Sequence, residues 1–257
     1  MNKVYPYKER IAKISANNRS SIILALDLES RYHNLKYIEN LIRHLNPYLC
    51  AIKINFHLLL PFSKNIIQKI NRVIHSYGLL SIADIKLNDV TNTNHVTLRY
   101  LHSMGFDSVI VNPIIGLTEL RSLVRLAHNF GMGVISLVYM SHKNVKEGYG
   151  LNIMQKGSKE SKLLPMFEIF LQYAKKSRVD GIIVGATHLK TLKHITSITK
   201  IPIYSPGIGT QGGNPKSAID NGSNYLIIGR SILNSRDKHK TLSKIAQVKG
   251  ILLTRKC

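Results

Sequence analysis

The stretch LLSIADIKLNDVTNTN, residues 79–94, decides how the rest of the chain is interpreted. Its apolar start, residues 79–83, is typical of a buried strand. If the strand continues to Lys86, Asp84 and Lys86 share one face, because side chains alternate along a strand with period two. Asp89 lies just past the strand end, in a loop before a helix. Two acids and an amine placed together indicate either a surface salt bridge or a site that handles charge and protons.

Similar apolar runs recur along the chain and alternate with helical patterns. Strands are expected at residues 21–27, 49–55, 79–86, 107–112, 132–140, 181–185, 201–205 and 224–229. Helices are expected at residues 35–45, 61–77, 93–104, 117–130, 163–176, 188–199 and 237–248, with a short one starting near residue 215. Continuously apolar strands indicate a parallel sheet covered on both faces. Eight repeats without a change in composition predict one α/β domain over residues 1–257, a (β/α)₈ TIM barrel, with a doubly wound open sheet as the alternative.

Two segments fall outside this repeat. Residues 1–20 are polar and basic, and we expect them to form a lead-in segment or a short helix. Residues 141–160 are polar, contain three glycines and show no clear periodicity. Long loops in compact domains often act as lids, so this segment is predicted to be a mobile active-site loop.

The chain is strongly basic, with 36 Lys and Arg against 14 Asp and Glu and a formal net charge of +22. Three explanations of this charge compete: the chain binds nucleic acid, it binds an anionic small substrate, or it comes from a proteome that is basic in general. The basic residues are spread along the whole length, aromatic residues make up 7% and Trp is absent. This dispersion favours a solvated basic surface, so we expect no specific nucleic-acid partner.

The remaining composition indicates a folded protein of a reducing compartment. An apolar fraction of 44% is enough for a sizeable core. Cys50 and Cys257 lack the spacing of a metal or redox motif, and we expect both to be free thiols. The N-terminus lacks the apolar core of a signal peptide, and no run approaches the roughly 20 apolar residues that span a bilayer. A cytoplasmic protein without a membrane partner is therefore expected.

The polar residues that interrupt the first three strands form the first candidate site. In a barrel, the C-terminal ends of the strands make the active face. Lys53 lies between two isoleucines, and a buried Lys requires an acidic partner. Asp27 and Asp84 are available on the two neighbouring strands. With Lys86 they are expected to form an alternating Lys–Asp cluster that leaves both amines near a substrate.

Two glycine-bearing turns form the second candidate site. SPGIGTQGG spans residues 205–213 and IIGRSI spans residues 227–232, after the seventh and eighth strands. Glycines let backbone N–H groups approach an anion closely, and these two loops are the usual phosphate site of a TIM barrel. Arg230 can add a bidentate charged contact. Tight turns alone would explain one such loop, whereas two in these places, with an Arg, favour phosphate binding.

Together these residues resemble the orotidine 5′-monophosphate decarboxylase family, in its smaller archaeal and bacterial form. The resemblance extends from about residue 21 to residue 235, in the family's order. It implies a homodimeric barrel that converts orotidine monophosphate to uridine monophosphate (UMP) and carbon dioxide, the last step of UMP biosynthesis, without a cofactor or metal. The matching segments are ALD at 25–27, IKI at 52–54, DIKLND at 84–89 with Thr93, MSH at 140–142, SPGIGTQGG at 205–213 and IIGRS at 227–231.

The resemblance also implies a role for each matching residue. Lys86 would protonate C6 of the pyrimidine as carbon dioxide leaves, beside Asp84, which would face the substrate carboxylate. Lys53 would hold the charge network and, with Asp27, contact the ribose hydroxyls. Asp89 and Thr93 would complete the site of the partner subunit. The other substrate-binding positions are Val90 and Ser141 at the pyrimidine, then Pro206, and Gln211, Gly229 and Arg230 at the phosphate.

Two other functions remain as alternatives. A metal-dependent sugar-phosphate decarboxylase or hexulose-phosphate synthase of the same superfamily shares the D-x-K-x-x-D element, but typically carries Glu at the position of Lys53. A non-catalytic, basic nucleic-acid-binding barrel needs no paired Asp and Lys at strand ends, and it leaves the phosphate-type turns unexplained. The chain departs from the family pattern at Thr91, where many relatives have Pro, and at His188, where Arg or a Pro-containing turn is common.

Overall fold

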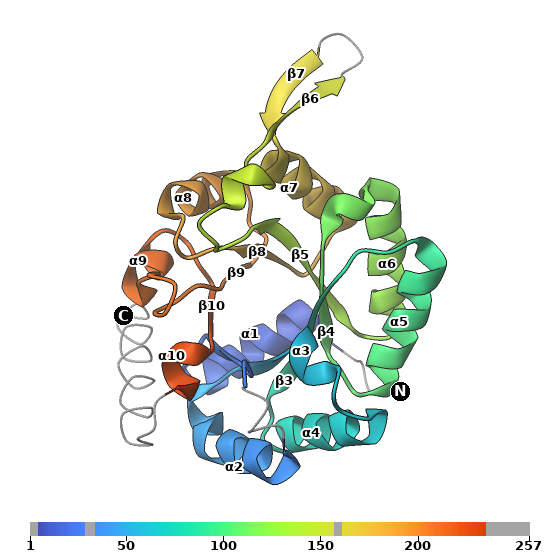
Figure 1. Ribbon diagram of the computed structural model, residues 1–257, viewed down its shortest axis with the longest axis vertical. Helices are drawn as coiled ribbons and strands as arrows, with labels where there is room; N and C mark the ends of the chain where they lie inside the picture. Colours follow the sequence, from blue (N-terminus) through green and yellow to red (C-terminus); the bar gives the residue numbers. More distant parts are fainter. Residues whose placement is uncertain (1–4, 29–33, 157–160, 235–257) are drawn as a thin grey trace.

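Eight parallel strands close into a barrel in a computed structural model of the protein, which describes residues 5–28, 34–156 and 161–234 (Figure 1). The chain passes round the barrel in sequence order, and β10 pairs back to β1. All eight predicted strands are confirmed, and the closed order rules out the open sheet. The strands are β1 (Ile22–Ala25), β2 (Ala51–Asn55), β3 (Leu80–Leu87), β4 (Ser108–Val111), β5 (Gly133–Tyr139), β8 (Gly181–Val184), β9 (Ile203–Ser205) and β10 (Tyr225–Ile228).

Helices connect successive strands and cover the outside of the barrel (Figure 1). The predicted helix at residues 237–248 lies outside the described residues. Short 3₁₀ turns η2 (Asn46–Tyr48), η3 (Pro113–Ile115) and η4 (Val145–Glu147) follow α2, β4 and β5. The helices are α1 (Tyr7–Asn17), α2 (Leu35–Leu45), α3 (Phe56–Leu59), α4 (Lys64–Ser76), α5 (Thr91–Ser103), α6 (Leu117–Asn129), α7 (Met166–Ser177), α8 (Leu189–Ile198), α9 (Pro215–Asp220) and α10 (Arg230–Leu233).

The strands are buried on both faces, which explains why their sequences are continuously apolar. Outward-facing residues such as Leu24 and Ile52 pack with helix residues such as Ile38 in one large cluster. Inward-facing residues such as Ile23 and Ile82 form a second cluster inside the barrel. The interior is therefore a packed core. Polar residues replace apolar ones at the C-terminal ends of the strands, and this is where the described part of the barrel can open to a ligand.

Helix α1 closes the barrel at the N-terminal ends of the strands. It is the short helix that was expected within the lead-in segment. Its Tyr7 is 1% exposed, and a Cβ on Gly133 would come within 2.3 Å of the Tyr7 ring. Arg10 holds the helix in place by donating a hydrogen bond of 2.6 Å to Asp107, just before β4. With this end filled, the C-terminal ends of the strands are the end that remains open to a substrate.

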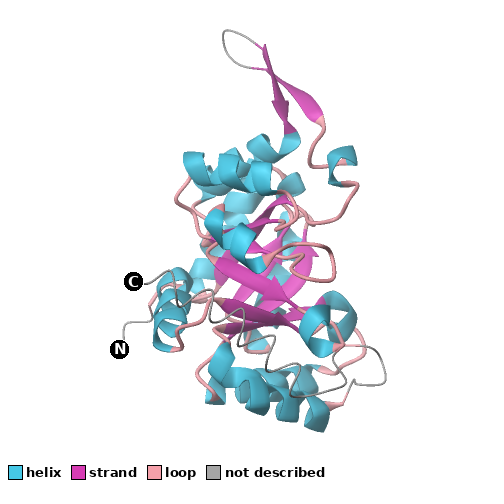
Figure 2. Cartoon of the chain, turned by 90° about the vertical axis from the view of Figure 1, so that its left-hand side faces the viewer, coloured by secondary structure: helices cyan, strands magenta, loops and turns pink. Residues whose placement is uncertain are grey.

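The prediction of an irregular loop over residues 141–160 is wrong for residues 152–156, which form a strand, and residues 157–160 lie outside the described part of the chain. Strands β6 (Asn152–Lys156) and β7 (Ser161–Pro165) form an antiparallel hairpin that projects from the barrel (Figures 1 and 2). Helix α7 accordingly begins at Met166, three residues later than expected. The directly opposed Met154 and Leu163 are each 60% exposed, so this ribbon has no buried face to impose a periodic sequence. Mobility of the segment stays a prediction.

Other expectations on the chain as a whole have mixed outcomes. None of the helices within the described ranges combines the length and the apolarity that crossing a bilayer requires. Cys50 is a buried free thiol, and Cys257 lies outside the described residues. A single domain over residues 1–257 stays a prediction.

Candidate active site

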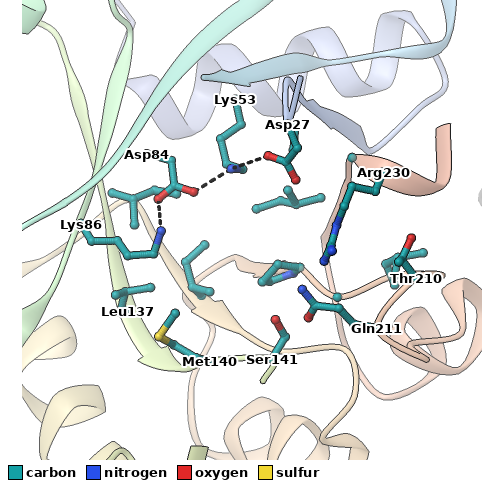
Figure 3. A pocket seen from close by; sticks show the side chains of 18 residues that line it. Asp27, Lys53, Asp84, Lys86, Leu137, Met140, Ser141, Thr210, Gln211 and Arg230 are labelled. Carbon is teal, nitrogen blue, oxygen red and sulfur yellow. Dashed lines mark hydrogen bonds and ion pairs between the residues drawn. The ribbon is translucent and has the colours of Figure 1, made fainter. Parts of the chain in front are cut away.

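A pocket opens at the C-terminal ends of the strands, where the sequence places its polar residues (Figure 3). Its wall is apolar where inward-facing strand residues such as Ile110, Leu137 and Ile227 line it. Figure 3 shows the Lys and Asp residues on one side and Arg230 with Gln211 on the other. Nine of the predicted site residues line this one pocket: Asp27, Lys53, Asp84, Lys86, Ser141, Pro206, Gln211, Gly229 and Arg230.

Three neighbouring strands bring the charged side chains into one array. Asp84 on β3 accepts from Lys53 on β2 at 2.6 Å and from Lys86 at 2.8 Å, one ammonium on each carboxylate oxygen. Asp27, just past β1, lies 4.0 Å from the Lys53 ammonium. Lys53 is 5% exposed and Asp84 is 8% exposed, so both charges are buried with their partners. The predicted alternating Lys–Asp cluster is confirmed.

The two ammonium groups keep Asp84 ionised despite its burial. Burial alone would raise the pKa of this carboxyl group, because it disfavours the charged form. The positive charges and hydrogen bonds of Lys53 and Lys86 outweigh that effect, and the pKa of Asp84 is lowered from its ordinary value. Asp84 therefore presents a fixed negative charge to the pocket at neutral pH.

Lys86 reaches the pocket through an irregular stretch of β3, and not through a regular strand. Its backbone has φ 48°, in the left-handed region that non-glycine residues rarely adopt. The register between β3 and β4 shifts between Ala83 and Leu87. Bulges of this kind re-aim a side chain, and strain of this kind is often found at functional sites. The prediction that Asp84 and Lys86 face the same side is right, but an unbroken period of two is not the reason.

The two glycine-bearing turns lie side by side across the pocket from Lys86 (Figure 3). Ser231 joins them, because it accepts from the Thr210 backbone N–H at 3.0 Å and donates to the Ile208 carbonyl at 3.1 Å. Gly207 has φ 94°, and a Cβ there would lie 2.8 Å from the Cβ of Ser141. Glycine at this position therefore lets the turn approach Ser141 closely.

Ser141 is held at the pocket by the end of β8. Thr187 donates a hydrogen bond of 2.9 Å to the Ser141 carbonyl, and a Cβ on Gly185 would lie 2.6 Å from the Ser141 Cα. His188, next in the chain, packs edge-on against Tyr139 with ring centroids 5.0 Å apart. Burial lowers the pKa of His188, which favours its neutral form. His188 thus packs against the end of β5, just before the 141–150 segment begins.

Comparison with known proteins agrees with this arrangement. The sequence pattern of the family described as "Orotidine 5'-phosphate decarboxylase / HUMPS family" matches residues 20–245, which include both halves of the pocket. The chain belongs to this family.

Individual family members match over nearly their whole length. Orotidine 5'-phosphate decarboxylase of Pyrococcus abyssi is 32% identical over 226 residues, which cover 87% of this chain and 96% of the relative. The enzyme of the same name from Thermoplasma volcanium is 32% identical over 226 residues, covering 88% and 91%. The solved structure of orotidine 5'-monophosphate decarboxylase from Methanocaldococcus jannaschii, complexed with inhibitor BMP, has a TM-score of 0.72 at 28% identity, covering 91% of this chain and 98% of that one.

Three residues that the family resemblance singled out lie outside the pocket of this chain. Asp89, Val90 and Thr93 are all exposed at the start of α5, and Val90 is 67% exposed. The buried Asn94 clamps the Asp89 backbone: it accepts from the Asp89 N–H at 3.1 Å and donates to the Asp89 carbonyl. The Asp89 side chain is therefore presented at the surface of the subunit from a fixed backbone.

Sequence reasoning on the family motifs named neither two residues that line the pocket nor a third that contacts its charged residues. Thr210 lies within the glycine-rich turn and Met140 precedes Ser141, and both line the pocket. Asn55, at the end of β2, accepts from the Lys53 ammonium and donates to Asp27. Its position two residues after Lys53 was a usable signal, because period two places both on one face of the strand.

Proposed function

We propose that this protein decarboxylates orotidine 5′-monophosphate to UMP and carbon dioxide. The observation that carries the proposal is the array of Lys86, Asp84 and Lys53 facing a pocket whose other side holds Arg230 and Gln211. The relatives from Pyrococcus abyssi and Thermoplasma volcanium bear the name of this enzyme. The cytoplasm is the proposed location, and the free thiol of Cys50 is compatible with a reducing compartment.

In this proposal Lys86 performs the proton transfer. Loss of carbon dioxide leaves negative charge on C6 of the pyrimidine, and an ammonium group beside it stabilises that charge more in the transition state than in the ground state. Lys86 then donates its proton to C6. Asp84 orients Lys86 through the 2.8 Å hydrogen bond and faces the carboxylate that leaves.

Substrate binding is assigned to the rest of the pocket. The guanidinium of Arg230, the amide of Gln211 and the turns at Pro206 and Gly229 hold the phosphate, with Arg230 suited to two parallel hydrogen bonds. Ser141 contacts the pyrimidine. Closure of residues 141–150 over the bound nucleotide would exclude water, and the phosphate contacts would supply binding energy for it.

The proposal includes a homodimer in which Asp89 and Thr93 complete the partner's site, with Val90 lining its pyrimidine end. The homodimer is supported by an exposed apolar surface near Asp89 and Thr93, formed by the segments that follow β2, β3 and β4. Thr93, Val96 and Tyr100 follow one another on one face of α5, and Val96 and Tyr100 are 46% and 57% exposed. Other exposed apolar residues after these strands are Phe56, Leu60, Val90 and Ile114. Burying such a surface against a second copy is favourable.

The reaction is tested directly by mixing the purified protein with orotidine monophosphate and a chelator, and following the pyrimidine absorbance. We expect conversion to UMP at an undiminished rate. The pocket presents two carboxylates that are already engaged by ammonium groups, and the described residues hold no group of three His, Cys, Asp or Glu suited to a metal. Conversion of hexulose phosphates that requires a divalent metal would instead support the sugar-phosphate alternative.

Mixed dimers test the sharing of sites between subunits. We expect Lys86→Ala and Asp89→Ala to be nearly inactive alone, and an equimolar mixture, after dissociation and reassociation, to regain roughly a quarter of wild-type activity, because half of the dimers would contain one intact site. Activity is measured as UMP formation per subunit. If the mixture stays as inactive as its parts while forming dimers, Asp89 acts within its own subunit or outside the site.

A further inference from the structure

Asn55 links the two charged groups at the inner edge of the pocket. It ends β2, two residues after Lys53, and its Cα pairs with that of Asp84 on β3. The Lys53 ammonium donates to the Asn55 amide oxygen, and the Asn55 amide nitrogen donates to Oδ1 of Asp27. Asn55 therefore lies between an ammonium and a carboxylate that are 4.0 Å apart.

The amide group is chemically suited to this position. Its oxygen only accepts and its nitrogen only donates, so it satisfies Lys53 on one side and Asp27 on the other without adding charge. A carboxylate here would face Asp27 with a like charge, and an apolar side chain would leave both partners short of a hydrogen bond. A helix cap is the simpler role for an Asn before a helix, but the Asn55 side chain makes no capping hydrogen bond to α3.

The contact with Asn55 also determines how Asp27 is turned. Oδ1 of Asp27 receives the hydrogen bond from Asn55, which directs the other oxygen, Oδ2, toward the turn after β10. A Cβ on Gly229 would lie 2.6 Å from that Oδ2. Asp27 thus lies at the end of the array next to the proposed phosphate turn, where the middle part of a nucleotide would lie.

We propose that Asn55 is a positioning residue for the ribose of the nucleotide. It holds Asp27 and Lys53 so that the carboxylate accepts from the ribose hydroxyls while the ammonium donates to them. This inference rests on the proposed function, because it needs a ribose phosphate in the pocket. It adds a fifth member to the array, in the order Lys86, Asp84, Lys53, Asn55 and Asp27.

The test compares the binding of two nucleotides that differ only in their ribose hydroxyls. Dissociation constants for UMP and for 2′,3′-dideoxy-UMP are measured by calorimetry on the wild type, Asn55→Ala and Asn55→Asp. We expect Asn55→Ala to weaken UMP by about tenfold or more, the effect of misplacing hydrogen bonds to charged groups, and dideoxy-UMP by less than about threefold. Asn55→Asp keeps the size and the acceptor but loses the donor, and it should weaken UMP at least as much as alanine.

A merely structural role for Asn55 makes different predictions. An equal loss for both nucleotides, or wild-type binding by the isosteric Asn55→Asp, would overturn the proposal. The matched control is Asn112→Ala at the end of β4, where the side chain accepts from the Ile114 N–H and does not line the pocket; it should leave both constants unchanged. If the wild type binds UMP and Asn55→Ala binds it equally well, only this inference fails. If the wild type does not bind UMP, the proposed function fails with it.

Discussion

Lys86→Ala is expected to lower the rate of decarboxylation by at least about 10³-fold, because it removes both the proton donor and the positive charge beside C6. Binding of UMP should weaken by less than about tenfold, since the phosphate and ribose contacts are made by other residues. The measurements are single-turnover rates with orotidine monophosphate and UMP dissociation constants. Separating the two quantities assigns Lys86 to the chemical step.

The fold should tolerate this change. The Lys86 side chain is 43% exposed, and Asp84 keeps its hydrogen bond to Lys53 when Lys86 is truncated. Alanine also retains a Cβ at φ 48°, so the backbone strain stays the same and only the amine is lost. Lys216→Ala, at an exposed pair on α9, is the control for loss of a surface Lys. Near-normal turnover in Lys86→Ala would refute the assignment of the reaction.

The barrel could be predicted from the sequence because each strand is buried on both faces. Burial on two faces forces a continuous apolar run, and the eight runs mark the eight strands directly. Lys53 was predictable for the same reason, since an ammonium inside such a run demands acidic partners on adjacent strands. In the structure, the Lys53 ammonium lies 2.6 Å from the Asp84 carboxylate and 4.0 Å from the Asp27 carboxylate.

Features without a buried face or a net charge could not be predicted in this way. The β6–β7 hairpin projects from the barrel, so burial did not shape its sequence. The left-handed backbone at Lys86 could not be read from the sequence, because glycine is the residue that usually marks such a position and a Lys stands here. Asn55 carries no charge, so charge pairing does not demand it, and the alternation of side chains along β2 is the one signal that places it beside Lys53.

Asp84→Asn is expected to destabilise the fold by about 3 kcal/mol at pH 7, because it leaves the ammonium of Lys53 buried without its main partner. This is the lower end of the cost of breaking a buried ion pair, since Asn55 still accepts from Lys53 and Asp27 remains 4.0 Å away. Denaturant unfolding of the variant and the wild type gives the difference. Lys216→Gln, which breaks the exposed pair with Asp220, should cost less than about 1 kcal/mol.

The difference between wild type and Asp84→Asn should also depend on pH in one direction. The folded-state pKa of Asp84 is lowered, so the ionised group stabilises the fold fully above its unfolded pKa of about 4, and this contribution is lost as the pH falls through the folded value. The two proteins should therefore differ most above about pH 5 and converge in stability as the pH falls below 4. A difference that persists unchanged in acid would show that the Asp84 charge does not stabilise the array, and would leave packing as the reason for any loss at pH 7.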